Sequence, residues 1–267
     1  MKPFEINEQS TLHSTSSNKL KHLFTFLLLL LVLWLSGRKV DFSLAMLVTG
    51  LPNMLDLLRE MFPPDWSYVS NITQPMLETI RMAILGTTFG AIIAIPIALF
   101  SARNVFEHPF ITIPTRFLLN LIRTIPDLLL ASIFVAVFGI GVLPGIFALT
   151  VFSIGIIAKL TFEAMESIDS GPLEAMTAVG ANKIKWIVFG VIPQVLPQFL
   201  SFVLYTFEVN VRAAAVLGLV GAGGIGLYYE RTLGFFEYDK TATIIIYTLV
   251  VVLIIDTIST KLREKLI

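Results

Sequence analysis

The sequence contains no cysteine, and only 14% of its 267 residues are charged. The lack of cysteine excludes disulfides, thiolate zinc sites and iron–sulfur clusters. The three histidines, His13, His22 and His108, are scattered singly in or beside polar segments, which favours solvated side chains over metal ligands. No metal site is therefore predicted. The formal net charge is zero, which argues against a nucleic-acid partner.

Apolar residues fill the place of the missing charges, at 55% of the chain. Soluble domains carry about 25% charged residues, so this composition is typical of a protein in a bilayer. A helix needs about 20 apolar residues to cross the hydrocarbon core. We therefore expect an all-α, polytopic membrane protein with about six transmembrane helices, at residues 22–37, 76–101, 117–139, 142–163, 187–209 and 240–260.

The first apolar run follows Lys19 and Lys21 and resembles either a signal peptide or an uncleaved anchor. The long leader and the absence of a small-residue cleavage site favour the anchor. Residues 1–21 are then a cytoplasmic tail, and residues 22–267 form the transmembrane domain. The excess of lysine and arginine on one side predicts that both termini are cytoplasmic, in a bacterial inner membrane. This cytoplasmic set comprises Lys2, Lys19, Lys21, Arg103, Arg116, Lys159, Lys183, Lys185, Lys261, Arg263 and Lys265.

The outer segment after the first span contains apolar residues at helical spacing, with Asp56, Arg59 and Glu60 on other faces. Pro63 and Pro64 end this pattern. It predicts an amphipathic helix over about residues 41–62, lying on the outer membrane interface.

The cytoplasmic segment of about residues 164–186 carries the signals of a short capped helix. Asp169 or Ser170 suits the N-cap, and Pro172 suits the first turn. Gly180 suits a left-handed C-terminal cap, which predicts a helix over 171–179. Such a helix is too short to be stable alone, so it must pack on its own membrane domain, on a partner, or on both. A plain capped loop remains the alternative from these residues alone.

This segment resembles the cytoplasmic signature of permease subunits of bacterial ABC importers. Met176 and Gly190 depart from the signature, and Ile192 stands at a leucine position. In that family the segment is a coupling helix that sits in a groove of the ATPase subunit. The resemblance implies a type I ABC importer permease-like fold and an ATPase-coupling role for Glu174, Ala175, Gly180, Asn182 and Pro193.

Over nearly its whole length the chain resembles the permease of phosphonate importers. The resemblance implies a homodimer with two ATPase subunits on the cytoplasmic side and a soluble phosphonate-binding protein outside. It also implies that the chain is no enzyme and binds no cofactor, with ATP and Mg held by the partner ATPase; the sequence indeed contains no Walker A motif. The stretches that carry the likeness are Phe62–Asp65, Gly180–Lys183, Val191–Val195, Phe207–Arg212 and Val220–Gly226.

Two pairs of opposite charges lie within the predicted spans or at their ends, four residues apart: Arg123 with Asp127, and Glu208 with Arg212. Each pair either lines a substrate path, together with Asn210, or is a structural ion pair. The first pair is expected about 9–15 Å into its span, with a bend at Pro126, and the second about 30 Å along its span, near the outer face. Because each arginine has an acidic neighbour, we expect a near-neutral path that leaves tight binding to a separate capture protein.

The glycines Gly221, Gly223, Gly224 and Gly226 formally match a dinucleotide-binding fingerprint. The strand–turn–helix context of that fingerprint is missing, so nucleotide binding is not predicted. The cluster instead predicts close backbone packing or a re-entrant turn between the last two spans, with a gate as one hypothesis.

The leading function is therefore a permease subunit of an ATP-driven importer of phosphonate, phosphite, phosphate or a related phosphorus oxyanion. Two rivals are an ion-coupled secondary transporter that uses Asp127 and Glu208, and a membrane scaffold without cargo.

Overall fold

The computed structural model describes residues 15–40 and 43–266. Most of the predicted cytoplasmic tail, residues 1–14, and the first two residues of the predicted outer helix lie outside the described residues. The chain divides into two units, Met1–Arg59 and Glu60–Ile267. The described residues are helical throughout, apart from turns and short connections, and contain no strand.

The first unit contains α1 (Thr15–Lys39) and nearly all of α2 (Leu44–Glu60). The part of α1 from Lys21 to Lys39 is long and apolar enough to cross a membrane, as predicted for the first span. Its leucines from Leu23 to Leu35 are exposed, which suits a helix surrounded by lipid. Helix α2 confirms the helix expected in this region; its place on the outer interface remains a prediction.

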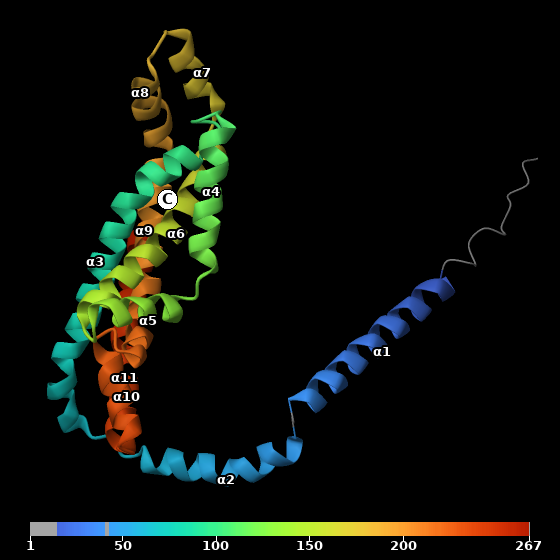
Figure 1. Ribbon diagram of the computed structural model, residues 1–267, viewed down its shortest axis with the longest axis vertical. Helices are drawn as coiled ribbons and strands as arrows, with labels where there is room; N and C mark the ends of the chain where they lie inside the picture. Colours follow the sequence, from blue (N-terminus) through green and yellow to red (C-terminus); the bar gives the residue numbers. More distant parts are fainter. Residues whose placement is uncertain (1–14, 41–42, 267) are drawn as a thin grey trace, which may run out of the picture. The chain divides into compact units, whose positions relative to one another are not determined.

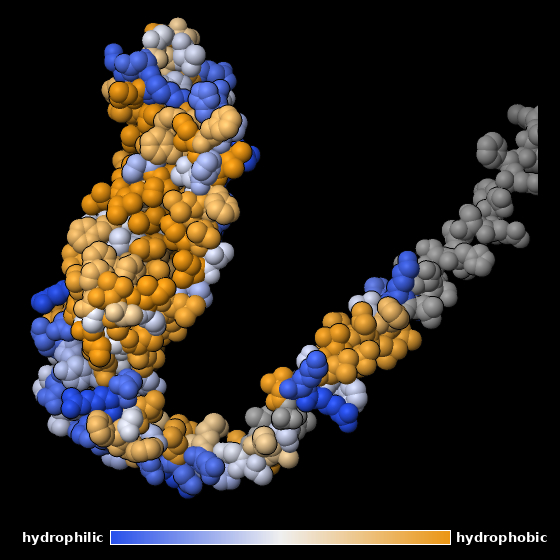
Figure 2. All heavy atoms as spheres, in the orientation of Figure 1, coloured by the Kyte–Doolittle hydropathy of each residue, from blue (hydrophilic) through white to orange (hydrophobic). Residues whose placement is uncertain are grey.

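The second unit holds the other apolar helices. Its surface is apolar around the middle and hydrophilic toward both ends, as Figure 2 shows and as a membrane-spanning body requires. Four rods in it are long and apolar enough to cross: Trp66–Ser101, Val142–Glu166, Lys183–Val220 and Tyr238–Glu264. The elements of this unit are η1 (Trp66–Tyr68), α3 (Val69–Ser101), α4 (Pro109–Thr124), α5 (Asp127–Phe138), α6 (Val142–Glu166), α7 (Ser170–Ala178), α8 (Lys183–Lys185), the π-helical η2 (Trp186–Val191), α9 (Ile192–Leu217), η3 (Gly218–Val220), α10 (Ile225–Gly234) and α11 (Tyr238–Glu264).

The third predicted span, 117–139, is not one straight helix. It consists of α4 and α5, which are bent by 87° at Ile125 and Pro126. Proline has no backbone N–H and disfavours helical geometry at the residue before it, so the helix ends there and restarts. The bend expected at Pro126 is confirmed. The single span is wrong, although the pair counted together gives the expected total of six crossings.

Helix α6 is the centre of the second unit and packs against α3, α4, α5 and α9. Small residues allow its close approach to α3. A Cβ atom added at Gly86 of α3 would lie 2.5 Å from the Cβ of Leu149 on α6, well inside contact distance. Small residues at helix contacts are typical of membrane proteins, in which dispersion and interhelical hydrogen bonds, rather than exclusion of water, hold helices together.

The second unit has two distinct ends (Figure 1). Helices α7 and α8 lie at one end, here called the α7 end, and α10 with the start of α11 lies at the other, the α10 end. At the α10 end, the Asp65 N–H donates to the Asp239 carbonyl oxygen over 3.3 Å, and the Thr243 hydroxyl donates to the Asp65 carbonyl oxygen over 2.9 Å. These bonds tie the segment before α3 to the start of α11.

Candidate functional site

Helix α7 has the caps that the sequence predicts. The Asp169 carboxylate accepts a hydrogen bond from the Gly171 N–H over 3.0 Å. At the other end Gly180 has φ +71° and its N–H donates to the Thr177 carbonyl oxygen, while the Ala181 N–H donates to that of Met176, both over 3.0 Å. These two bonds form a Schellman motif, which needs a left-handed residue at the position of Gly180.

The restart after Gly180 also follows the prediction. Asn182 caps the next helix, because its side-chain oxygen accepts a hydrogen bond from the Lys185 N–H over 2.9 Å. The π-helical stretch η2 that follows, with Ile192 N–H bonded to the Ile187 carbonyl oxygen, was not predicted. Pro193 lies just beyond it and has no N–H for a regular helical bond, so the wider π-turn gives the chain a way into α9.

One face of α7 packs on its own unit. Leu173 is buried, and its carbonyl oxygen accepts a hydrogen bond from the Trp186 ring N–H over 3.2 Å. A Cβ atom added at Gly190 would lie 2.9 Å from Leu173 Cδ2, so the glycine makes room for the leucine. Gln194 of α9 links the start of α7 to η2. Its amide oxygen accepts a hydrogen bond from the Asp169 N–H over 3.1 Å, and its amide nitrogen donates to the Gly190 carbonyl oxygen over 2.7 Å.

The opposite face of α7 is exposed among the residues that the structure describes. Glu174 and Ala175 are exposed, and Val179 is 76% exposed. Ile184, at the start of the next helix, is 73% exposed. The segment is thus a capped helix with one side packed on its unit and an outer side that exposes apolar residues, a shape suited to contact with another protein.

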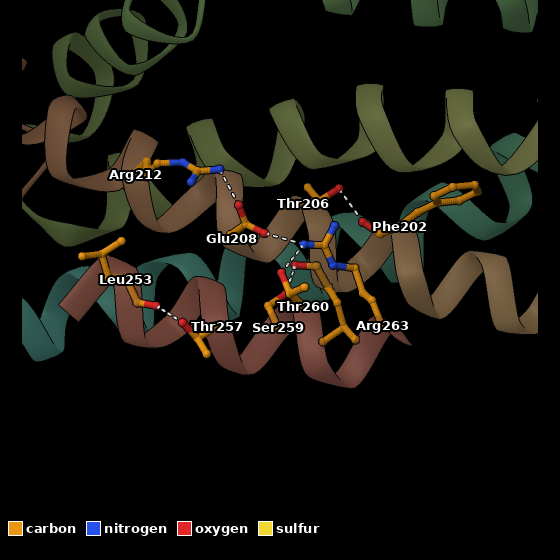
Figure 3. A network of polar contacts seen from close by, with 10 residues as sticks. Phe202, Thr206, Glu208, Arg212, Leu253, Thr257, Ser259, Thr260 and Arg263 are labelled. Atoms are coloured by element: carbon orange, nitrogen blue, oxygen red, sulfur yellow. Dashed lines mark hydrogen bonds and ion pairs between the residues drawn. The ribbon is translucent and has the colours of Figure 1, made fainter. Parts of the chain in front are cut away.

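The second predicted charge pair is present and is larger than expected. Arg212 Nη2 lies 2.6 Å from Glu208 Oε1, as the four-residue spacing predicts. Arg263, near the end of α11, binds the other carboxylate oxygen, with Nη2 2.8 Å from Glu208 Oε2. Figure 3 shows this arginine–glutamate–arginine triad between α9 and α11. The pairing of Arg263 with Glu208 could not be predicted from the sequence, because which residue of one helix faces another depends on packing.

The triad bears on two expectations. Glu208 lies beside the last turn of α11, whereas α11 begins at the α10 end, so the pair lies away from the α10 end; its expected place near the outer face stays a prediction. The rod that contains Glu208 runs from Lys183 to Val220, well beyond the predicted 187–209. Glu208 therefore lies within its rod and not at the rod's far end. Two arginines and one glutamate also carry a formal charge of +1, so the site is not neutral.

The first predicted pair is not present. Arg123 lies in the last turn of α4 and Asp127 begins α5, so the break at Pro126 removes the helical spacing that would have brought them together. The Asp127 carboxylate instead accepts a hydrogen bond from the Leu128 N–H over 3.0 Å. Arg123 lies with its alkyl stem over Gly155 of α6, where an added Cβ would be 2.9 Å from Arg123 Cγ.

Asn210 is fully buried and joins three helices. Its amide nitrogen donates to the Thr87 hydroxyl of α3 and to the Ser153 hydroxyl of α6, each over 2.7 Å. Its amide oxygen has no hydrogen-bond partner among the described residues. This geometry holds α3, α6 and α9 together inside the chain.

The glycine cluster forms a tight turn between η3 and α10. Gly221, Gly223 and Gly224 all have positive φ, at +88°, +84° and +70°. The Gly221 carbonyl oxygen accepts a hydrogen bond from the Gly141 N–H over 2.9 Å. A Cβ atom at Gly223 would lie 2.9 Å from the Val142 nitrogen. Gly226 packs directly on Gly218, which the sequence did not single out. Close backbone packing, one of the two predicted structures, is therefore what this cluster adopts.

The fold and these sites define a multi-pass helical membrane protein with a structured helix at one end and charged residues within its spans. Residues 94–267 match the family model described as "Binding-protein-dependent transport system inner membrane component". The chain therefore belongs to this family of inner-membrane transport components.

Two relatives and one solved structure agree with the family. The chain is 38% identical over 218 residues to the phosphite transport system permease protein PtxC of Stutzerimonas stutzeri, covering 82% of this chain and 79% of the relative. It is 36% identical over 232 residues to the phosphate-import permease protein PhnE of Mycolicibacterium smegmatis, covering 87% of this chain and 44% of the relative. The inward-facing MetNI methionine ABC transporter has a chain of similar fold, with TM-score 0.67 and 23% identity, covering 76% of this chain and 99% of that one. The expected ABC importer permease fold is thus confirmed, and no comparison supports the secondary transporter.

Proposed function

We propose that this chain is the permease subunit of an ATP-driven importer whose cargo is a phosphorus oxyanion such as phosphite, phosphate or a phosphonate. The observation that carries the proposal is the 38% identity to a phosphite transport permease across about four-fifths of both chains. The shared chemistry of these cargoes is a small tetrahedral anion with several P–O oxygens. Arginine suits such an anion because its planar guanidinium donates two hydrogen bonds at once.

The free face of α7 is the proposed contact with the ATPase. The buried Leu173 and the Gln194 bonds fix α7 to the unit, so a push on the exposed residues is passed to α9. Glu174, Ala175, Gly180, Asn182 and Pro193 carry this coupling role. ATP and Mg would be bound by the ATPase, which would supply the hydrolysis that this permease does not perform.

The complete importer would contain a second copy of this chain, two ATPase subunits at the α7 end and a soluble oxyanion-binding protein at the α10 end. The α7 end then faces the cytoplasm, together with both termini. Residues Arg123, Asp127, Glu208, Asn210 and Arg212 are proposed to lie along the path. For Asn210 the buried bonds to α3 and α6 support a role in holding the path walls together, rather than contact with cargo.

The glycine turn is proposed as a fixed point against which the path opens. Its close contacts with the start of α6 support a fixed turn more than a moving gate.

Uptake into proteoliposomes tests the proposal. The permease is reconstituted with its ATPase inside and its binding protein outside, and labelled phosphite, phosphate and methylphosphonate are offered. We expect uptake of at least one of them that needs both ATP and the binding protein and persists when a protonophore collapses the proton gradient. Uptake that survives without ATP but stops with the protonophore would contradict the proposal and favour the ion-coupled rival.

A further inference from the structure

The triad of Arg263, Glu208 and Arg212 leaves the more exposed arginine, Arg212, with unused hydrogen-bond donors. Glu208 is the buried member, with its side chain 7% exposed, while Arg263 is 25% and Arg212 49% exposed. Each carboxylate oxygen binds one arginine. Arg263 also donates from the same Nη2 atom to the Thr260 hydroxyl over 3.1 Å, and its buried Nε has no hydrogen-bond partner among the described residues. Arg212 has five N–H donors, and the described residues supply it with one acceptor, Glu208.

Arg263 changes the electrostatics of this place. A buried glutamate beside a single arginine would form a neutral pair with little attraction for another anion. With the second arginine bound to the same carboxylate, one positive charge is uncompensated. Because Arg212 is the more exposed of the two arginines, it is the one that presents this charge to its surroundings.

Arg212 also lines a cavity. A space of about 600 Å³ opens between α9, α10 and α11, and Arg212 belongs to its wall together with residues such as Val216, Ile225, Tyr229 and Leu249. The other lining residues that the structure describes carry no charge. Such apolar walls screen a charge poorly, so the field of Arg212 is felt across the cavity more strongly than it would be in water.

We propose that Arg212 is a contact for the phosphorus oxyanion in transit, and that Arg263 is a positioning residue that keeps the charge of Arg212 available by neutralising Glu208. This inference rests on the proposed function. In this arrangement the attraction of the anion depends on the summed charge of Arg212, Glu208 and Arg263, and not on Arg212 alone.

Charge counting gives a test that separates this role from a structural one. In Arg263→Gln the remaining pair is neutral. Uptake at a saturating concentration of loaded binding protein should then fall about tenfold, the scale of one unit charge acting over roughly 12 Å at an effective dielectric of about 20. In the double variant Glu208→Gln with Arg263→Gln, Arg212 again carries a net positive charge, and most of the uptake should return. A purely structural triad predicts the reverse order, because the double variant lacks every ion pair.

Lys261→Gln is the matched control, because it removes a positive charge from the exposed surface of the same end of α11 and should leave uptake unchanged. The amount of permease in the membrane is measured for every variant. A double variant no better than Arg263→Gln would overturn the proposal. So would a defect of Arg263→Gln that appears only in vesicles containing anionic phospholipid, since the anion would then be a headgroup.

Uptake by the wild-type protein shows whether the proposed function or only the role of Arg212 and Arg263 has failed. If it carries no phosphorus oxyanion, the proposed function fails and this inference fails with it. If it transports but the variants do not follow the charge count, the inference alone fails.

Discussion

At the scale of single residues, Gly180 and Gly223 both have a positive φ that other residues adopt only with strain, but glycine is needed at the two positions for different reasons. Gly180 closes the Schellman motif of α7 in open space, with no atom within 4 Å of an added Cβ. Gly223 has a similar φ but faces the backbone of α6. The same residue type therefore serves the shape of a turn in one place and close packing in the other.

Replacing Gly180 by valine should disturb the end of α7 without disturbing insertion. Positive φ is costly for a β-branched residue, on the order of 1–3 kcal/mol, so the turn should open and the orientation of Glu174 and Ala175 should be lost. We expect ligand-stimulated ATPase activity and uptake to fall severalfold at normal membrane levels. Gly234→Val is the control, because that glycine has open space and no positive φ. Normal uptake in Gly180→Val would refute the coupling role of this turn.

Replacing Gly223 by alanine tests the close packing of the glycine turn. The added Cβ would meet the Val142 nitrogen at 2.9 Å, and backbone cannot move aside as a flexible side chain can. Gly139→Ala is a matched control, since φ there is +82° and no atom lies within 4 Å. Overpacking costs about 1–3 kcal/mol, so the thermal unfolding midpoint should drop clearly further for Gly223→Ala than for Gly139→Ala. Equal midpoints would show that strain, and not contact, governs the turn.

At the scale of elements, α7 is joined to the unit by few contacts, and each of them leads to η2 or α9. Leu173 packs at Gly190, Trp186 bonds back to Leu173, and Gln194 bonds to Asp169. Just before α7, Glu166 at the end of α6 pairs with Arg116 of α4 and accepts from the Arg103 N–H over 2.8 Å. The short helix is therefore stabilised by its packing on the domain, as its length requires.

Leu173→Ala should loosen α7 while leaving the membrane body intact. Removing a buried leucine side chain costs about 2–5 kcal/mol, and here the loss falls on the few contacts that hold this helix. In the purified permease without its ATPase, limited proteolysis should cut residues 164–186 faster in Leu173→Ala than in the wild type. Val179→Ser on the exposed face should leave cutting unchanged and weaken ATPase association instead. Equal cutting of Leu173→Ala and the wild type would contradict the anchoring role.

At the scale of the whole molecule, hydropathy and capping signals were enough to predict the all-α class, the rods and α7. They failed where the outcome depends on contacts between helices. Arg263 could not be paired with Glu208 from the sequence, because neither spacing nor composition says which faces of α9 and α11 meet. The Arg123–Asp127 pair failed for a local reason: the spacing rule holds only in a continuous helix, and Pro126 interrupts it.

Asn210 illustrates the same limit from another side. A polar residue within a span is a candidate for function, yet its bonds to Thr87 and Ser153 show a contact between three helices. Only the register of α3, α6 and α9 decides between these roles, and that register depends on small residues such as Gly86 on facing helices.

We propose that this permease couples delivery of a phosphorus oxyanion to ATP hydrolysis by an external ATPase. The most direct measurement is the ATPase rate of the reconstituted complex with the binding protein empty and then loaded with phosphite, phosphate or methylphosphonate. We expect at least one loaded form to raise the rate severalfold over the empty form, and Gly180→Val to abolish this rise. A rate that is the same with empty and loaded binding protein, for every oxyanion, would contradict the account.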